Sequence, residues 1–106
     1  MNALEKRVLD KFKALLLKQV SLYKLILFGS RARGDAGTYS DMDVVVILDD
    51  ASNEQDFDYV SDYAWEAGFE YGIVIVPVVC TKKEWEESPE RYSLLAKAVK
   101  REGVLL

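Results

Sequence analysis

The feature that most limits the fold of this chain is a run of five aliphatic residues, Val44 to Leu48, of which four are β-branched. Because such a run has no polar side, it predicts a strand that is buried on both faces. The apolar run Lys24–Phe28 predicts another strand, and Phe69–Cys80 predicts a third, with Pro77 at an edge position or a bulge. A buried sheet is therefore expected at the centre of the fold.

Helical periodicity surrounds these strands. Apolar side chains recur at three- and four-residue spacing in Ala3–Gln19, which predicts an amphipathic helix. A second helical stripe starts near Asn53 and is expected to end at Gly68. A turn over 82–87 follows the third strand, and Pro89 suits the first turn of a last helix. The predicted order is α-β-β-α-β-α.

Composition excludes several kinds of chemistry. The 106 residues make one domain, 1–106, with no histidine and one cysteine, Cys80, so His-dependent relays and His/Cys zinc sites are not available. The single cysteine, the lack of a secretory signal pattern and the lack of an apolar run of roughly 20 residues favour a cytoplasmic protein with no membrane segment. A net charge of −4 argues against bulk binding to nucleic acid.

A glycine-rich segment follows the first predicted strand. Gly29 lets a ligand approach the backbone, and Ser30 supplies a hydroxyl at the start of whatever short helix follows. Arg31 and Arg33 add guanidinium groups, either as phosphate contacts or as solvated surface charges. The segment predicts a site for the phosphates of a nucleotide.

Two carboxylates stand at the start of the second strand. Asp41 and Asp43 are two residues apart, so both side chains share one face with Cα atoms roughly 6–7 Å apart. Oxygen-only ligands favour Mg²⁺ or Mn²⁺, and two such ions can activate an attacking hydroxyl and stabilise pyrophosphate without a histidine. Ser40 counts as a candidate nucleotide-binding residue, although organising the turn before Asp41 is its simpler role.

A family resemblance joins these two halves. The run Gly29-Ser30-Arg31-Ala32-Arg33-Gly34, followed after five residues by Ser40-Asp41-Met42-Asp43, resembles the signature of the minimal nucleotidyltransferases of the polymerase-beta superfamily. The similarity extends over nearly the whole chain. It implies an α/β (α+β) nucleotidyltransferase fold, with a small mixed β-sheet flanked by about four helices, and ATP or another NTP and Mg²⁺ as ligands.

The same resemblance implies a partner. Members of this type are often encoded beside a HEPN-domain protein, and in the better-understood pairs the small nucleotidyltransferase is an antitoxin that adenylylates a tyrosine of its HEPN toxin. The expected reaction is therefore transfer of NMP, in the simplest case AMP from ATP, to a hydroxyl on a HEPN-type partner.

One part of the superfamily pattern is missing. A third carboxylate usually lies on the strand that corresponds to Phe69–Cys80, but the matching positions, Val74–Val78, are apolar or proline. Glu70, the acid on this predicted strand, lies about 20 Å from Val76 at strand rise. The alternative is therefore a catalytically weak or inactive module that acts by binding its HEPN partner. An acid beside Asp43 on the third strand favours the enzyme, and a valine favours the binding module.

Aromatic residues and sheet edges bear on partners. Trp65, Trp85, Tyr63 and Tyr92 fall at helical positions consistent with core packing, and any of them that is exposed would mark a partner surface. An exposed edge on so small a sheet also leaves homo-oligomerisation open.

Overall fold

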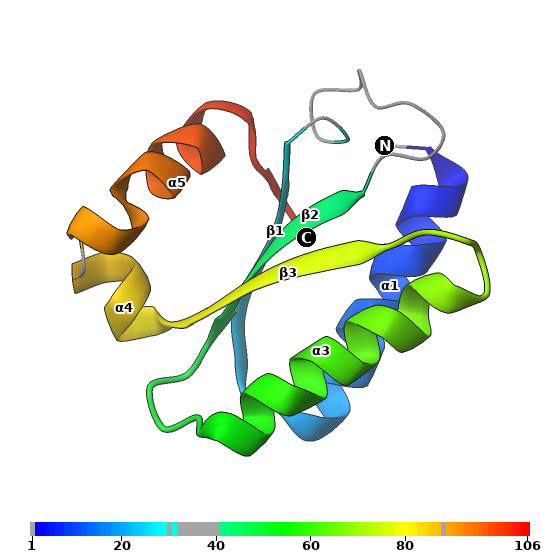
Figure 1. Cartoon of the computed structure of the whole chain (residues 1–106), viewed down its shortest axis with the longest axis horizontal. Coiled ribbons are helices and arrows are strands. Elements are labelled where there is room, and N and C mark those ends of the chain that lie inside the picture. Colours follow the sequence, from blue (N-terminus) through cyan, green and yellow to red (C-terminus); the bar gives the residue numbers. More distant parts are fainter. Residues whose placement is uncertain (1, 30, 32–40, 88) are drawn as a thin grey trace.

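A computed structural model describes residues 2–29, 31, 41–87 and 89–106, with the backbone alone for 89–94. The elements along the chain are α1 (Ala3–Gln19), β1 (Leu22–Phe28), β2 (Met42–Leu48), α3 (Glu54–Phe69), β3 (Ile75–Thr81), α4 (Lys82–Glu87), α5 (Pro89–Glu102) and β4 (Val104–Leu105). The predicted α-β-β-α-β-α order is confirmed, with α4 as a separate short helix and β4 as a short last strand (Figure 1).

The four strands form one mixed sheet in the order β3-β2-β1-β4. β2 pairs in parallel with β3, whereas β1 is antiparallel to both β2 and β4. Helices α1 and α3 lie on one face of the sheet and α4 and α5 on the other (Figure 1). The expected mixed sheet flanked by helices is therefore confirmed, and β3 is an edge strand.

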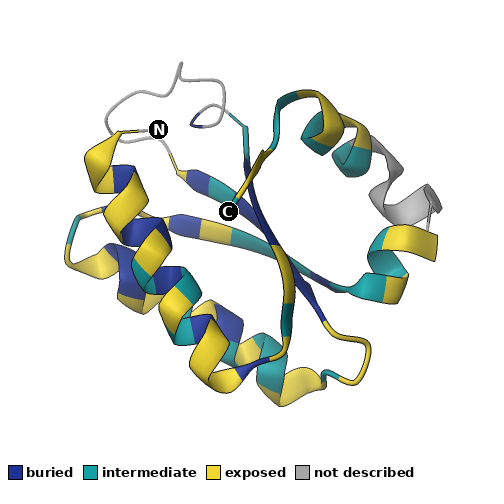
Figure 2. Ribbon diagram, turned by 180° about the vertical axis from the view of Figure 1, so that it is seen from behind, coloured by how far each residue is buried: buried dark blue, intermediate teal, exposed yellow. Residues whose placement is uncertain are grey.

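The central strand β2 is buried on both faces, as its aliphatic run predicts. Val44 to Leu48 are fully buried, and in Figure 2 much of the sheet between the two helical layers is dark blue. Val44, Val46 and Leu48 pack with α1 and α3, while Val45 and Ile47 pack on the opposite face with Cys80. Burial of each such side chain contributes about 1.5–3 kcal/mol, so this strand supplies a large part of the core.

The two long helices begin at the same local motif. Asn2 caps α1 and Asn53 caps α3, and each side chain accepts a hydrogen bond from the backbone N–H three residues later. Glu5 and Asp56 return the bond to the N–H of the cap, which completes a capping box at each start. The start of α3 predicted at Asn53 is confirmed.

The end of α3 and the start of β3 differ from the sequence prediction. The helix continues through Gly68 to Phe69, and β3 begins only at Ile75. A Cβ on Gly68 would lie 1.9 Å from the carbonyl oxygen of Ile73, so this glycine allows close packing inside the helix rather than ending it. The left-handed residue of the turn is Gly72, with φ +66.

Glu70 consequently lies in the turn after α3 and not on a strand. It caps the helix, and its Oε2 lies 3.6 Å from Nζ of Lys11 on α1.

Across the described parts of the chain, no helix combines the length and apolar character needed to cross a bilayer.

Candidate functional site

The two carboxylates of the predicted metal site stand at the start of β2. Asp41 directly precedes the strand and is exposed, while Asp43 is half-buried. Asp43 lies beside Phe28 of β1 and Val76 of β3, its register partners on the two neighbouring strands. Because residues alternate along a strand, Asp43 shares its face with Val45 and Ile47. This is the face that α4 and α5 cover further along the sheet.

The electrostatics of this corner favour a cation. Burial raises the pKa of Asp43, and the neighbouring charge of Asp41 raises the pKa further. A divalent cation between the two carboxylates would relieve both the repulsion and the desolvation of Asp43. The donor set, carboxylate oxygen alone, suits Mg²⁺ or Mn²⁺.

The glycine of the predicted phosphate site touches this carboxylate pair. Gly29 follows the last residue of β1 and has φ +78, a backbone conformation that residues with a side chain rarely adopt. A Cβ built on Gly29 would lie 2.6 Å from Oδ2 of Asp43. The structure therefore brings the glycine and the second carboxylate of the sequence motif into direct contact, although 14 residues separate them along the chain.

Arg31 has a role that neither sequence interpretation included. It is buried, and its Nη1 donates a hydrogen bond of 3.1 Å to Oε2 of Glu5 on α1, which is also buried. The other carboxylate oxygen of Glu5 accepts the Asn2 N–H of the capping box at 2.9 Å. Arg31 is thus tied to the first turn of α1.

The partners of Glu5 set its ionisation state. Burial tends to raise the pKa of Glu5, but the Asn2 N–H and the Arg31 guanidinium outweigh it and hold the pKa below its usual value. Sequence reasoning placed Glu5 among the polar positions of the helix. Glu5 precedes Val8 by three residues and Leu9 by four, and this helical spacing indicates that Glu5 lies on the buried side of α1.

Three of the predicted site residues, Ser30, Arg33 and Ser40, lie outside the described residues. Their part in nucleotide binding stays a prediction.

The third strand places a valine, not an acid, beside the carboxylates. The parallel register pairs Asp43 with Val76, and Val76 is 39% exposed. In the part of the chain that the structure describes, no group of three or more His, Cys, Asp and Glu side chains is arranged to hold a metal ion. Asp41 and Asp43 alone still fit one Mg²⁺, because this ion is commonly held by one or two carboxylates together with nucleotide phosphates and water.

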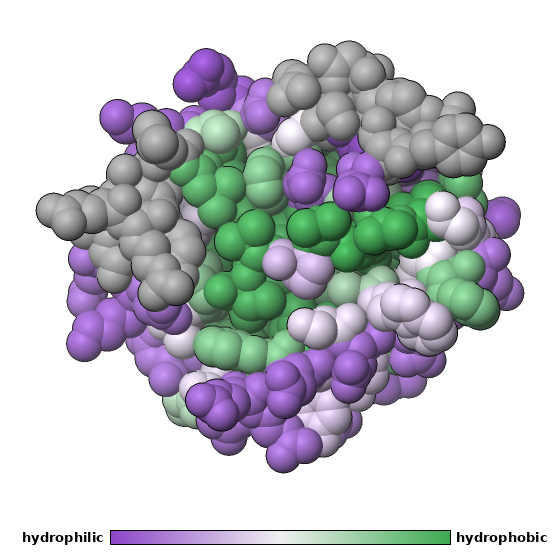
Figure 3. Space-filling model, viewed as in Figure 1, coloured by the Kyte–Doolittle hydropathy of each residue, from purple (hydrophilic) through white to green (hydrophobic). Residues whose placement is uncertain are grey.

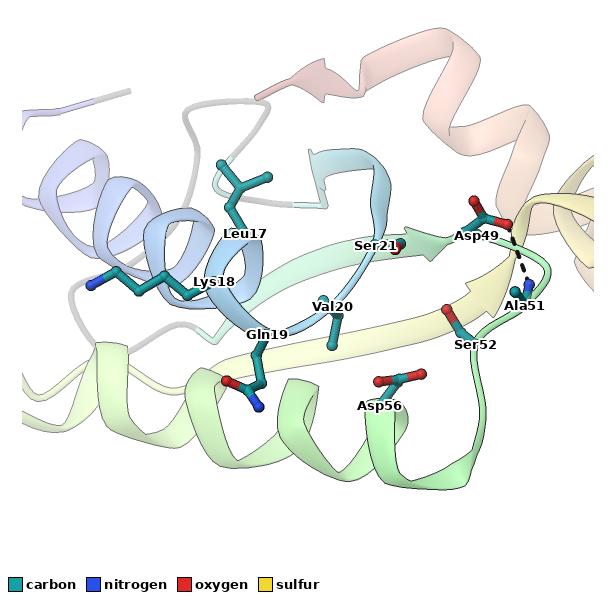
Figure 4. A pocket seen from close by; sticks show the side chains of 9 residues that line it. All are labelled: Leu17, Lys18, Gln19, Val20, Ser21, Asp49, Ala51, Ser52 and Asp56. Atoms are coloured by element: carbon teal, nitrogen blue, oxygen red, sulfur yellow. Dashed lines mark hydrogen bonds between the residues drawn. The ribbon is translucent and has the colours of Figure 1, made fainter.

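A separate hollow lies at the other end of the sheet. It has a volume of about 310 Å³ and is lined by the end of α1, the β2–α3 connection and the start of α3, including Lys18, Asp49 and Asp56 (Figure 4). Oδ1 of Asp49 accepts a hydrogen bond of 3.2 Å from the Ala51 N–H, so this carboxylate caps the turn after β2. The whole length of β2 separates Asp49 from Asp43, so Asp49 adds no ligand to the carboxylate pair.

Comparison with known proteins gives three results. A family model described as "Nucleotidyltransferase domain" matches residues 5–105. A curated relative from Methanocaldococcus jannaschii, named "Putative protein adenylyltransferase MJ0604", is 45% identical over 56 residues, which are 53% of this chain and 51% of the relative. The chain therefore spans about half the length of that relative.

The third result is a solved structure, "Crystal structure of the toxin-antitoxin with AMP-PNP". It superposes with a TM-score of 0.64 at 21% sequence identity, over 91% of this chain and 69% of the other. At this level of identity the likeness shows a shared fold.

Proposed function

Because the chain belongs to the nucleotidyltransferase domain family, we propose that it transfers a nucleoside monophosphate, AMP from ATP, to a hydroxyl group of a partner protein. The observation that carries the proposal is the contact between Gly29 and the Asp43 carboxylate, with Asp41 two residues away. This corner combines a backbone that a phosphate can approach closely with a carboxylate pair suited to Mg²⁺.

The residues divide the work as follows. Asp41 and Asp43 would hold the cation, and the bare Cα of Gly29 leaves room for the Asp43 carboxylate beside the turn where the phosphates would bind. When bound there, Mg²⁺ would neutralise charge on the phosphates and on the leaving pyrophosphate. The acceptor oxygen forms the new bond to the α-phosphorus, the bond to pyrophosphate breaks, and the hydroxyl proton passes to solvent.

The choice of ATP and of a protein acceptor has two supports. The relative from Methanocaldococcus jannaschii is named a protein adenylyltransferase, and the solved neighbour is a toxin–antitoxin structure with AMP-PNP. The family resemblance adds a HEPN-domain protein as the partner, with this chain as the antitoxin in the cytoplasm.

A second candidate function is favoured by Val76. With a valine in the register position beside Asp43, the described residues supply two carboxylates to the site, where the superfamily usually uses three. Fewer ligands make it harder to hold a second cation and to activate the attacking hydroxyl. The alternative is a module that neutralises its HEPN partner by binding, with little or no transfer.

One experiment separates the two functions. The full chain is incubated with α-labelled ATP, Mg²⁺ and the HEPN protein encoded beside it, and label on the partner is measured together with partner affinity. Transfer that is lost in the double variant Asp41→Asn/Asp43→Asn, but kept in the control Asp49→Asn, supports the enzyme. Absence of label, or label undiminished in the double variant, contradicts it, and unchanged partner affinity in that variant then favours the binding module.

A further inference from the structure

Helix α3 presents two aromatic residues to solvent. Trp65 and Phe69 are 66% and 69% exposed, and their rings stack with centroids 4.7 Å apart. Asp58 and Asp62 precede them on the same side of the helix, since the spacing of four, three and four residues repeats one helical face. Large aromatic side chains are rarely left in water as a pair, so this face is a candidate contact surface.

The aromatic pair opens onto a groove. Trp65, Phe69, Val74 and Ile75 help to line a groove of about 300 Å³ between α3 and the start of β3. Val74 is 60% exposed. In Figure 3 hydrophobic residues gather over this strand and its surroundings, and hydrophilic residues border them along α3. Together five residues form what we call the α3–β3 surface: Asp58, Asp62, Trp65, Phe69 and Val74.

The edge of β3 decides how a partner is recognised here. The Met42 N–H donates a hydrogen bond of 2.8 Å to the Val74 carbonyl. In a parallel pair every second residue bonds to the neighbouring strand, so the backbone groups of Val76 point toward β2 and those of Pro77 point to the free edge. Proline has no N–H, so the middle of the free edge lacks a donor. An added strand could not form a continuous ladder, and recognition has to rely on side chains.

Charge selects the kind of partner. The stretch Glu54–Glu70 contains six acidic residues and no basic one. One of them, Glu70, is paired with Lys11. A second copy that docked through the same face would set two such acidic helices against each other, which is unfavourable. A positively charged segment gains from the same field.

We propose that the α3–β3 surface binds a basic segment of a partner protein that carries apolar side chains, with Trp65 and Phe69 as its anchors. Aromatic residues in a groove are typical anchors of protein interfaces, and the acidic residues around them supply orientation. Val74 belongs to this surface, and its carbonyl accepts the N–H of Met42, the residue between Asp41 and Asp43. A segment docked here is brought to the edge of the candidate site.

The existence of a protein partner rests on the proposed function, but binding is measured without nucleotide. A phage-displayed library of random 12-residue peptides is panned on the immobilised full chain, and the enriched peptides are synthesised. We expect sequences of net positive charge with aromatic or aliphatic residues. Their affinity should fall at least tenfold in Trp65→Ser/Phe69→Ser and decrease with added salt.

Matched variants keep the test specific. Leu17→Ser removes an apolar side chain that is 59% exposed on α1 and should leave peptide affinity unchanged. Asp58→Asn/Asp62→Asn should weaken binding several-fold, whereas Asp10→Asn, an exposed acid on α1, should not. All the changed side chains are exposed, so unfolding curves close to that of the wild type are expected.

Three results would overturn the proposal. They are enrichment of neutral or acidic peptides, peptides that bind the Trp65→Ser/Phe69→Ser variant as well as the wild type, and a wild-type dimer in sedimentation that dissociates in that variant. Failure of nucleotidyl transfer is distinguishable, because peptide affinity should be the same in Asp41→Asn/Asp43→Asn.

Discussion

Replacing Gly29 by alanine tests the contact on which the candidate site depends. The left-handed backbone at φ +78 costs an alanine about 1–2 kcal/mol. The new Cβ would lie 2.6 Å from Oδ2 of Asp43, about 0.8 Å inside ordinary contact at 3.4 Å, so the carboxylate must leave its rotamer. That movement adds about 0.5–1.5 kcal/mol. We expect Gly29→Ala to lower the free energy of unfolding by about 2–3 kcal/mol.

The chain supplies a matched control for the backbone cost. Gly72 has a similar φ of +66, but a Cβ there meets nothing within 4 Å, so Gly72→Ala should cost only about 1–2 kcal/mol. Urea unfolding of both variants measures the difference, which corresponds to a shift of about 4–8 °C in Tm per kcal/mol for a domain of this size. Calorimetric titration with Mg²⁺-ATP should show weaker binding in Gly29→Ala and unchanged binding in Gly72→Ala.

A double-mutant cycle isolates the contact itself. An Asp43→Ala background removes the carboxylate and leaves the Asp43 Cβ at an ordinary 3.6 Å, so Gly29→Ala should cost about 1 kcal/mol less than in the wild type. If the two substitutions are additive, or if Gly29→Ala costs no more than Gly72→Ala, Gly29 and the Asp43 carboxylate do not touch and do not form the candidate site.

Three further predictions concern the same corner of the molecule. Glu5→Gln should lower stability by about 3 kcal/mol, because it breaks one side of a buried ion pair with Arg31. Since the pKa of Glu5 is lowered in the folded state, this contribution is present above the unfolded pKa and is lost as pH falls through the folded pKa. Asp43→Asn should raise stability at pH 7 by about 1 kcal/mol, because burial and the Asp41 charge make ionisation of Asp43 unfavourable, and the gain should vanish below pH 3.8. Val76→Asp should raise the rate of label transfer about tenfold by supplying a third acid beside Asp43, which corresponds to an activation barrier lower by about 1.4 kcal/mol.

Controls and contrary results differ among these three. Adding Arg31→Met to Glu5→Gln should recover most of the stability, and a double variant no more stable than Glu5→Gln alone contradicts a buried ion pair. For Asp43→Asn, equal stability with the wild type from pH 3 to 8 contradicts the raised pKa. Val76→Asn has similar size without the charge, so an equal effect of both changes at Val76 argues against metal ligation.

Local sequence signals were sufficient for most of the elements. Each capping box is built from residues three positions apart, and the burial of Val44–Leu48 follows from its aliphatic composition, so neither needs distant partners to be recognised. The predicted end of α3 was wrong because a glycine can either end a helix or allow another segment to pack closely against it. Gly68 is required by the carbonyl of Ile73, a contact that sequence spacing does not reveal.

The sequence by itself determined the family, the order of elements and the two halves of the candidate site, because these depend on short motifs and periodicity. The tertiary structure decided which residues meet. The register of β1 on β2 sets Gly29 against Asp43, and the parallel register of β3 sets Val76 beside the same carboxylate. It also paired Arg31 with Glu5 and left Trp65 and Phe69 in solvent on α3. Such neighbours are set by the packing of distant segments, and no local pattern contains them.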